Sequence, residues 1–214
     1  MKKISLIVYD FDGTLVDTLA DITDSVNLTL VEMCLNTLDR KTIRGNIGNG
    51  VVKLMTRSLI DSGSDDVETA VSLFRKHYNR HLLDQTDFYP YGREIVEYFS
   101  EKKNAILSNK PFVFIEKILR SLDFLQPFDS ILGGDSLDVQ KPDPKGLQFL
   151  MSKLNCSVNQ VLMIGDSAID IETGKQAEVI TCGVTYGLGD LDALRNAKPD
   201  YLIDSLNCLK KLFN

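Results

Sequence analysis

The chain has 214 residues, of which 43% are hydrophobic and 25% are charged, the composition of an ordinary globular protein with a core that needs no disulfide bonds. Thirty Asp and Glu residues outnumber 24 Lys and Arg residues, and the net charge of -6 argues against a broad surface for nucleic acid or for an anionic membrane. No segment reaches the roughly 18 consecutive apolar residues of a membrane-spanning helix.

The predicted elements alternate between strands and helices along most of the chain. The first is a strand over residues 4–9, whose apolar, β-branched sequence suits a strand buried on both faces. Later runs of the same kind cover residues 105–107, 161–164, 179–182 and, more weakly, 201–203. Helical patterns cover residues 93–102, 113–122, 145–154 and 169–177. This alternation predicts an α/β domain with a mostly parallel sheet.

One long segment departs from this alternation. Residues 19–83 contain no convincing strand and have the pattern of successive amphipathic helices, for instance over residues 21–35 and 51–60, with glycines between them. We therefore predict a helical cap domain, residues 18–84, inserted into an α/β core domain that consists of residues 1–17 and 85–214.

Acidic residues follow two of the predicted strands at their carboxyl ends. Asp10 and Asp12 follow the first strand, and Asp166 and Asp170 follow a later one. Ligands of open α/β sheets bind in the crevice outside these ends, so we expect the four carboxylates to converge. Helix capping is the alternative explanation for the second pair, but capping does not explain four acids in one crevice.

Lys141 provides a positive charge for the same crevice. It stands in the run Lys-Pro-Asp-Pro, and because a proline restricts the residue before it, we expect this lysine to be held in a fixed, extended direction. Four ionised acids and one lysine leave a charge of -3, which would repel a phosphate of about -2. A divalent cation reduces this repulsion, and oxygen ligands around a phosphoryl group favour Mg²⁺. The sequence therefore predicts phosphoryl transfer with Mg²⁺.

Four segments in this order carry a resemblance to a known family. They are Asp-Phe-Asp-Gly-Thr-Leu-Val-Asp-Thr from residue 10, Ser-Asn-Lys from residue 108, Lys-Pro-Asp-Pro from residue 141 and Gly-Asp-Ser from residue 165. The set resembles the motifs of the haloacid dehalogenase superfamily, specifically its phosphatases, and this form of it is similar to phosphoglycolate phosphatases. The resemblance covers nearly the whole chain and implies a Rossmann-like α/β core with an inserted α-helical cap.

The resemblance also implies a role for each core residue. Asp10 would be the nucleophile that forms an aspartyl phosphate. Asp12 would protonate the leaving alkoxide and then activate water, while Lys141 would neutralise charge beside Asp10. The implied metal-binding residues are Asp10, Asp12 (through its backbone carbonyl), Asp166 and Asp170. The predicted substrate-binding residues of the core are Thr14, Ser108, which would hydrogen-bond the phosphoryl group, and Asn109.

Substrate choice is expected to come from the cap, because the core contacts only the phosphate. Arg44, Lys53 and Arg57 are candidate cations. Asn49 and Gly50 stand at a predicted helix start that could hold a carboxylate. The alternative is that these charges only solvate an amphipathic helix. The functional interpretation suits a small carboxylated phosphate such as 2-phosphoglycolate.

We predict a Mg²⁺-dependent phosphatase of small phosphorylated metabolites, with conversion of 2-phosphoglycolate to glycolate and phosphate as the favoured reaction. The alternatives are a pyrophosphatase, a nucleotide or sugar-phosphate phosphatase, and a catalytically silent phosphate-binding protein. We expect a small phosphorylated partner, no nucleic acid or membrane partner, and a monomer or homodimer. Four widely spaced cysteines without a Cys-x-x-Cys pair or a signal peptide predict reduced thiols and a cytoplasmic location.

Overall fold

A six-stranded parallel sheet forms the centre of the protein in the computed structural model, which describes residues 4–213. The strand order is β5-β4-β1-β6-β7-β8, and every neighbouring pair is parallel. These strands are β1 (Leu6–Tyr9), β4 (Lys103–Leu107), β5 (Ser130–Leu132), β6 (Val161–Gly165), β7 (Ile180–Val184) and β8 (Tyr201–Ile203). The α/β fold class predicted from the sequence is confirmed.

The first strand lies in the middle of the sheet, where the strand order reverses. The chain adds β4 and β5 on one side of β1, and then β6, β7 and β8 on the other side. Tyr9, the last residue of β1, pairs with Ile106 of β4 and with Ile164 of β6. The carboxyl ends of these three strands therefore meet at one point, which is where ligands bind in sheets of this topology.

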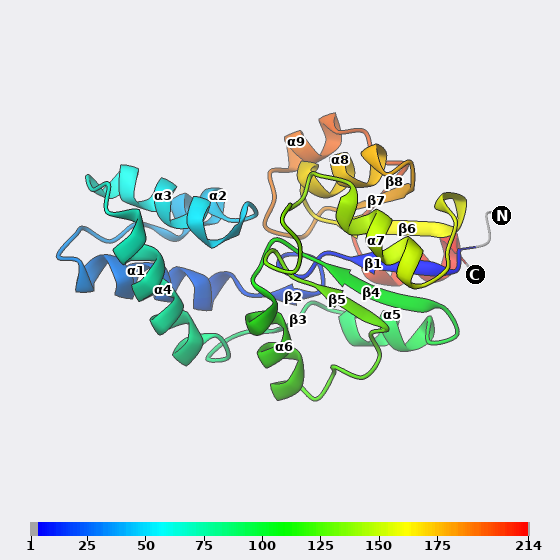
Figure 1. The fold of residues 1–214 in the computed structure, drawn as a ribbon, viewed down its shortest axis with the longest axis horizontal. Coiled ribbons are helices and arrows are strands. Elements are labelled where there is room, and N and C mark those ends of the chain that lie inside the picture. Colours follow the sequence, from blue (N-terminus) through cyan, green and yellow to red (C-terminus); the bar gives the residue numbers. More distant parts are fainter. Residues whose placement is uncertain (1–3, 214) are drawn as a thin grey trace.

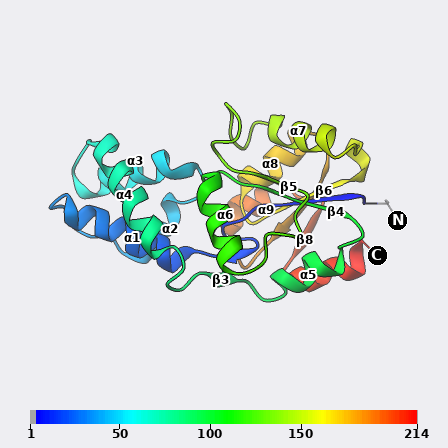
Figure 2. The same cartoon turned by 60° about the horizontal axis from the view of Figure 1, so that its bottom comes forward.

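Helices cover both faces of the sheet (Figures 1 and 2). They are α5 (Gly92–Tyr98), α6 (Phe112–Ser121), α7 (Lys145–Lys153), α8 (Ala168–Gln176), α9 (Leu191–Asn196) and α10 (Leu209–Leu212), with short 3₁₀ turns η1 (Val158–Gln160) and η2 (Leu206–Cys208). Successive residues of β1 point to opposite faces. Ile7 and Tyr9 belong to the apolar cluster that holds residues of α5 and α6, whereas Leu6 and Val8 belong to the cluster that holds residues of α7. Both faces of β1 are therefore buried, which is why its sequence is apolar throughout.

Four further helices lie together beside the sheet (Figure 1). They are α1 (Leu19–Glu32), α2 (Arg40–Asn46), α3 (Gly50–Ser62) and α4 (Val67–His81), and we call them the helical cap. A two-stranded antiparallel ribbon flanks them, in which β2 (Val16–Asp17) pairs with β3 (Asp87–Phe88). The domain boundaries at residues 17/18 and 84/85 stay a prediction.

One strand of the central sheet was not predicted from the sequence. The strand β5 was missed because only two of its three residues are apolar, whereas the predicted strand over residues 201–203 has three. Among the described residues, no helix is both long enough and apolar enough to span a membrane.

Candidate active site

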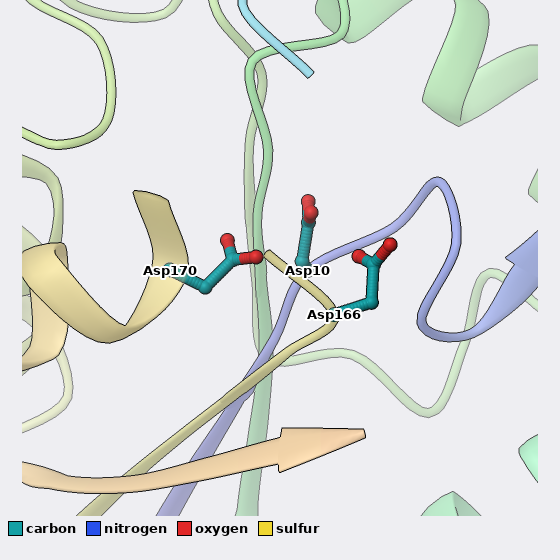
Figure 3. Close-up of side chains that lie close together, drawn as sticks. All are labelled: Asp10, Asp166 and Asp170. Atoms are coloured by element: carbon teal, nitrogen blue, oxygen red, sulfur yellow. The ribbon is translucent and has the colours of Figure 1, made fainter. Parts of the chain in front are cut away.

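Three buried carboxylates gather at the carboxyl edge of the sheet. Asp10 directly follows β1, Asp166 directly follows β6, and Asp170 lies in the first turn of α8. One carboxylate oxygen of each residue lies within 4.8 Å of the others, and all three residues are buried (Figure 3). Three of the four carboxylates predicted to converge therefore do so, although their catalytic and metal-binding roles stay predictions.

Lys141 lies between two of these carboxylates. Its Nζ is 2.8 Å from Asp10 Oδ1 and 2.5 Å from Asp170 Oδ1. Asn109 holds the lysine backbone from both sides, because its Oδ1 accepts from the Lys141 amide (2.9 Å) and its Nδ2 donates to the Lys141 carbonyl (3.1 Å). The Asn109 Nδ2 also donates to the Gly48 carbonyl of the cap (3.1 Å). Asn109 therefore positions the lysine and links the cap to the sheet.

Backbone and hydroxyl donors orient the other two acids. Asp166 Oδ2 accepts from the amides of Leu188 (2.7 Å) and Gly189 (2.9 Å), and its Oδ1 accepts from the Thr14 hydroxyl (3.1 Å). Asp170 Oδ2 accepts from the backbone amide (3.0 Å) and the hydroxyl (2.6 Å) of Ser167, the N-cap of α8. Asp170 therefore caps α8 and also forms an ion pair with Lys141. Thr14, predicted to bind substrate, is hydrogen-bonded to Asp166, and its substrate-binding role stays a prediction.

Gly13 permits the tight turn that brings these acids together. Its φ is +83°, a conformation that L side chains rarely adopt, and a Cβ at this position would overlap the carboxylate of Asp166. A glycine is therefore required between Asp12 and Thr14 for two separate reasons, backbone conformation and space.

Burial and repulsion from neighbouring carboxylates make Asp10 and Asp166 poor anions when no metal is bound. Burial, together with the charges of Asp170 and Asp166, raises the pKa of Asp10 to about 8 against the opposing effect of Lys141. Burial and the charge of Asp170 raise the pKa of Asp166 to about 6. Burial disfavours the charged form of Lys141, but Asp10 and Asp170 outweigh it and its pKa is raised. Three buried oxygen donors with one balancing lysine are compatible with a divalent metal ion.

The side chain of Asp12 lies outside this cluster and has its own partners. Its Oδ1 accepts from the Thr18 hydroxyl (2.7 Å) and from Lys110 Nζ (2.9 Å). Lys110 also bonds the hydroxyl of Tyr78 in the cap (2.7 Å). Sequence reasoning did not assign a role to Lys110 or Tyr78. The only available signal was the position of Lys110 directly after a strand, in the Ser-Asn-Lys segment.

A cavity of about 160 Å³ opens from the acids toward the cap. Asp10, Asp12 and Asp166 line it from the sheet side together with Ser108 and Lys110, all at or after strand ends. Residues of α2, α3 and α4 line the opposite wall. The volume is below the roughly 300–1,000 Å³ of pockets for drug-sized ligands, so the cavity suits a small metabolite.

Some of the predicted specificity residues of the cap line the cavity, and others do not. Arg44 and Gly50 line the cavity. Arg44 also reaches the sheet domain, where its Nε donates to the Leu188 carbonyl (2.9 Å). Asn49 is the residue before α3, and its Oδ1 accepts a hydrogen bond from Arg57 of α3. Neither Asn49 nor Arg57 lines the cavity. Lys53 is exposed and does not line the cavity, because it faces solvent on the outer side of α3.

The fold and the site together define a doubly wound α/β enzyme with an acidic, metal-compatible centre at the switch point of its sheet, beneath a helical cap. Comparison with known proteins agrees with this class. Residues 7–184 match the haloacid dehalogenase-like hydrolase family. A phosphoglycolate phosphatase of Colwellia psychrerythraea is 33% identical over 216 residues, covering 97% of this chain and 96% of the relative. A phosphoglycolate phosphatase of Haemophilus influenzae is 34% identical over 212 residues, covering 94% and 95%.

A solved structure has nearly the same fold. The crystal structure of a predicted phosphoglycolate phosphatase from Haemophilus somnus superposes with a TM-score of 0.94, at 28% identity and with full coverage of both chains. The chain belongs to the haloacid dehalogenase-like hydrolase family, and it is a phosphatase of that family.

Proposed function

We propose that this phosphatase hydrolyses 2-phosphoglycolate to glycolate and phosphate with Mg²⁺ as its cofactor. One observation carries the chemistry: Asp10, paired with Lys141, and Asp12 both line one small cavity at the carboxyl edge of β1. The substrate is supported by relatives of about one-third identity over nearly the whole chain, which are named phosphoglycolate phosphatases. Arg44 in the cavity wall favours a substrate that carries negative charge beyond the phosphate.

The first chemical step is attack by Asp10. A carboxylate oxygen of Asp10 forms a bond to phosphorus, the bond between phosphorus and the ester oxygen breaks, and its electron pair stays on the ester oxygen. Asp12 gives a proton to that oxygen, so glycolate leaves as an alcohol rather than as an alkoxide. Lys141 lies 2.8 Å from Asp10 Oδ1 and offsets the negative charge that builds up around phosphorus.

The second step returns the enzyme to its starting state. A water oxygen attacks the phosphorus of the aspartyl phosphate while Asp12 takes the water proton. The bond between phosphorus and the Asp10 oxygen breaks, and inorganic phosphate is released. The two steps balance, because the proton that Asp12 loses in the first step is regained in the second.

Asp10, Asp166 and Asp170 are the side chains that would hold the metal, with the backbone carbonyl of Asp12 as a further donor. Their oxygen-only chemistry and close spacing fit Mg²⁺. When bound, the ion lowers the repulsion between the carboxylates and the phosphate and helps to orient the transferring group. Ser108, buried at the end of β4 and in the cavity wall, would hydrogen-bond a phosphate oxygen.

Steady-state kinetics on a panel of phosphate esters tests the proposal. We expect kcat/KM to be highest for 2-phosphoglycolate among 2-phosphoglycolate, pyrophosphate, a mononucleotide and a sugar phosphate, and activity to disappear in EDTA and return with MgCl₂. Asp10→Asn should be inactive. Higher kcat/KM for pyrophosphate or the mononucleotide would refute the substrate, and full activity of Asp10→Asn would refute the mechanism.

The remaining predictions concern the setting of the protein. A cytoplasmic location is proposed from the cysteine pattern, and the described structure holds Cys34, Cys156, Cys182 and Cys208 as free thiols. A monomer or a homodimer remains the expected assembly, which sedimentation analysis distinguishes.

A further inference from the structure

A buried lysine outside the acidic cluster contacts the proposed acid–base residue. The side chain of Lys110 is 4% exposed, and its Nζ lies 2.9 Å from Asp12 Oδ1, 3.3 Å from Asp12 Oδ2 and 2.7 Å from the hydroxyl oxygen of Tyr78. An ammonium group has three N–H donors, and these three oxygens provide an acceptor for each. Lys110 is therefore committed to Asp12 and Tyr78 rather than available for a substrate group.

Tyr78 is held rigidly, although it belongs to the cap. Its ring stacks on Phe74 of the same helix at 5.3 Å between centroids and packs edge-on against Phe114 of α6 at 5.1 Å. Lys110 Nζ also lies 4.4 Å from the centroid of the Tyr78 ring, within the range of a cation–π contact. Burial and the charge of Asp12 raise the pKa of Tyr78 well above its usual value, so its hydroxyl stays neutral and accepts from Lys110.

Asp12 is thus oriented by groups that depend on the cap. Thr18, the residue before α1, donates to Asp12 Oδ1, while Lys110 is fixed by Tyr78 of α4. Asp12 and Lys110 are 98 residues apart in sequence, and Lys110 and Tyr78 are 32 apart. The neighbouring strands β1 and β4 bring Asp12 and Lys110 together, and the packing of α4 against the sheet domain adds Tyr78.

A purely structural role would not require this chemistry. Burying an ammonium group is costly unless charged and polar partners compensate, and an apolar side chain of similar length would fill the same space without that cost. The charge is directed at the one carboxylate that the proposed reaction uses for proton transfer. This arrangement favours a functional explanation for Lys110 and Tyr78.

We propose that Lys110 and Tyr78 are positioning residues that hold the Asp12 carboxylate toward the leaving-group oxygen when the helical cap is seated. The inference rests on the proposed function, because it requires Asp12 to be the proton donor. Lys110 acts through Asp12, and Tyr78 acts through Lys110. Replacement of either residue should therefore lower kcat/KM strongly for esters whose leaving group needs a proton. The decrease should be smaller for esters whose leaving group departs as a stable anion.

The test compares two substrates with different leaving groups. 2-Phosphoglycolate releases a basic alkoxide, whereas p-nitrophenyl phosphate releases a stabilised phenolate. We would measure kcat/KM, which reports steps up to formation of the aspartyl phosphate, for the wild type, Tyr78→Phe, Lys110→Met and the double variant. Because general acid catalysis contributes about 10²–10⁴-fold, we expect roughly a 10-fold loss for Tyr78→Phe and roughly 100-fold for Lys110→Met on 2-phosphoglycolate. The loss on p-nitrophenyl phosphate should be several times smaller.

The double variant tests whether Tyr78 acts through Lys110. We expect it to be no worse than Lys110→Met alone, since two residues of one chain of contacts are not additive. Lys117→Met is the matched control: Lys117 Nζ bonds the Asn79 carbonyl and Oδ1 of α4, the residue beside Tyr78, without touching Asp12. If this variant only impairs the seating of the cap, its kcat/KM should fall equally for both substrates. Tyr78→Phe keeps the ring stack, so it remains informative if Lys110→Met folds poorly.

Asp12→Asn separates failure of this inference from failure of the proposed function. Suppose that Asp12→Asn lowers kcat/KM more for 2-phosphoglycolate than for p-nitrophenyl phosphate, while Tyr78→Phe and Lys110→Met lower it equally for both substrates. The positioning role is then overturned, and Asp12 remains the proposed acid. If Asp12→Asn itself shows no leaving-group dependence, the acid role fails and the inference fails with it. If all three variants lower kcat/KM more for 2-phosphoglycolate than for p-nitrophenyl phosphate, the result supports both the acid role of Asp12 and the positioning role.

Discussion

Replacement of Asp166 by asparagine should stabilise the metal-free protein, although Asp166 is one of its most connected buried side chains. Its carboxylate accepts hydrogen bonds from two backbone amides and from Thr14, yet burial and Asp170 raise its pKa from 3.8 to about 6. An asparagine can keep this geometry, because its oxygen can accept from the two amides and its amino group can donate to the Thr14 hydroxyl. The substitution therefore removes the charge and little else.

The magnitude follows from the pKa. The folded state binds the proton of Asp166 more tightly than the unfolded chain does, so stability falls as the pH rises from about 4 to about 6, and the whole penalty is present above that range. A shift of about two pKa units corresponds to about 3 kcal/mol. For a protein of this size, 1 kcal/mol moves Tm by about 2–4 °C, so Asp166→Asn should raise Tm by up to about 6–12 °C at pH 7 in EDTA.

Magnesium should reverse the order of the two proteins. Ligand binding to the folded state stabilises it by about 4.1 kcal/mol at 1,000 times Kd. The wild type should gain this amount, which exceeds the charge penalty of about 3 kcal/mol, while the variant, which lacks one ligand, gains little. Thermal unfolding by calorimetry, with EDTA or MgCl₂ at constant ionic strength, measures both effects. Asp200→Asn is the matched control, because Asp200 also accepts from a backbone amide and a hydroxyl, both of Thr181, but lies outside the acidic cluster. It should not be stabilised.

Two results would refute this reasoning. One is a lower Tm for Asp166→Asn than for the wild type in EDTA at pH 7, which would mean that the hydrogen bonds outweigh the repulsion. The other is a stabilisation that persists undiminished at about pH 4, where the wild-type carboxyl is protonated in the folded protein and no charge remains to be removed.

Three further predictions test the turn, the lysine and the cap. Gly13→Ala should lower the free energy of unfolding by several kcal/mol, whereas Gly63→Ala, with nearly the same φ but open space around it, should lose only about 1–2 kcal/mol in urea unfolding. Lys141→Met leaves two buried carboxylates without their cation, so we expect a loss of about 3–5 kcal/mol in EDTA by the same method and a kcat at least about 100-fold lower in phosphate-release assays. Arg44→Met should raise KM for 2-phosphoglycolate about 10-fold and Lys53→Met should leave it unchanged, since only Arg44 lines the cavity; equal effects would contradict this assignment.

The residues of the acidic cluster could be predicted because topology brings strand ends together without any detail of packing. Once Asp10 and Asp166 follow parallel strands, the order of the sheet places them at one edge. Lys141 could be added because the proline that follows it restricts its backbone. These inferences need only chain direction, strand position and the restricted conformations of particular residues.

The cap contacts could not be predicted in the same way. Arg44 and Lys53 are both cations of the same helical region, but one lines the cavity and the other faces solvent. Helical periodicity indicates which face of a helix is apolar. It does not indicate which polar residue reaches the cavity, because that depends on how α2 and α3 are placed against the sheet domain. Tyr78 likewise has the pattern of a core residue, which it is, and nothing local indicates that its hydroxyl meets Lys110.

The sequence by itself therefore determined the α/β class, the edge of the sheet that carries the chemistry, and the acids with their counter-charge. Only the tertiary structure decided which cap residues face the cavity and which groups orient Asp12. The physical reason is the range of the interactions. The alternation of strands and helices implies parallel strands whose carboxyl ends share one edge, and a proline restricts the residue before it. The contact of Tyr78 with Lys110, in contrast, depends on how a cap helix packs against the sheet domain.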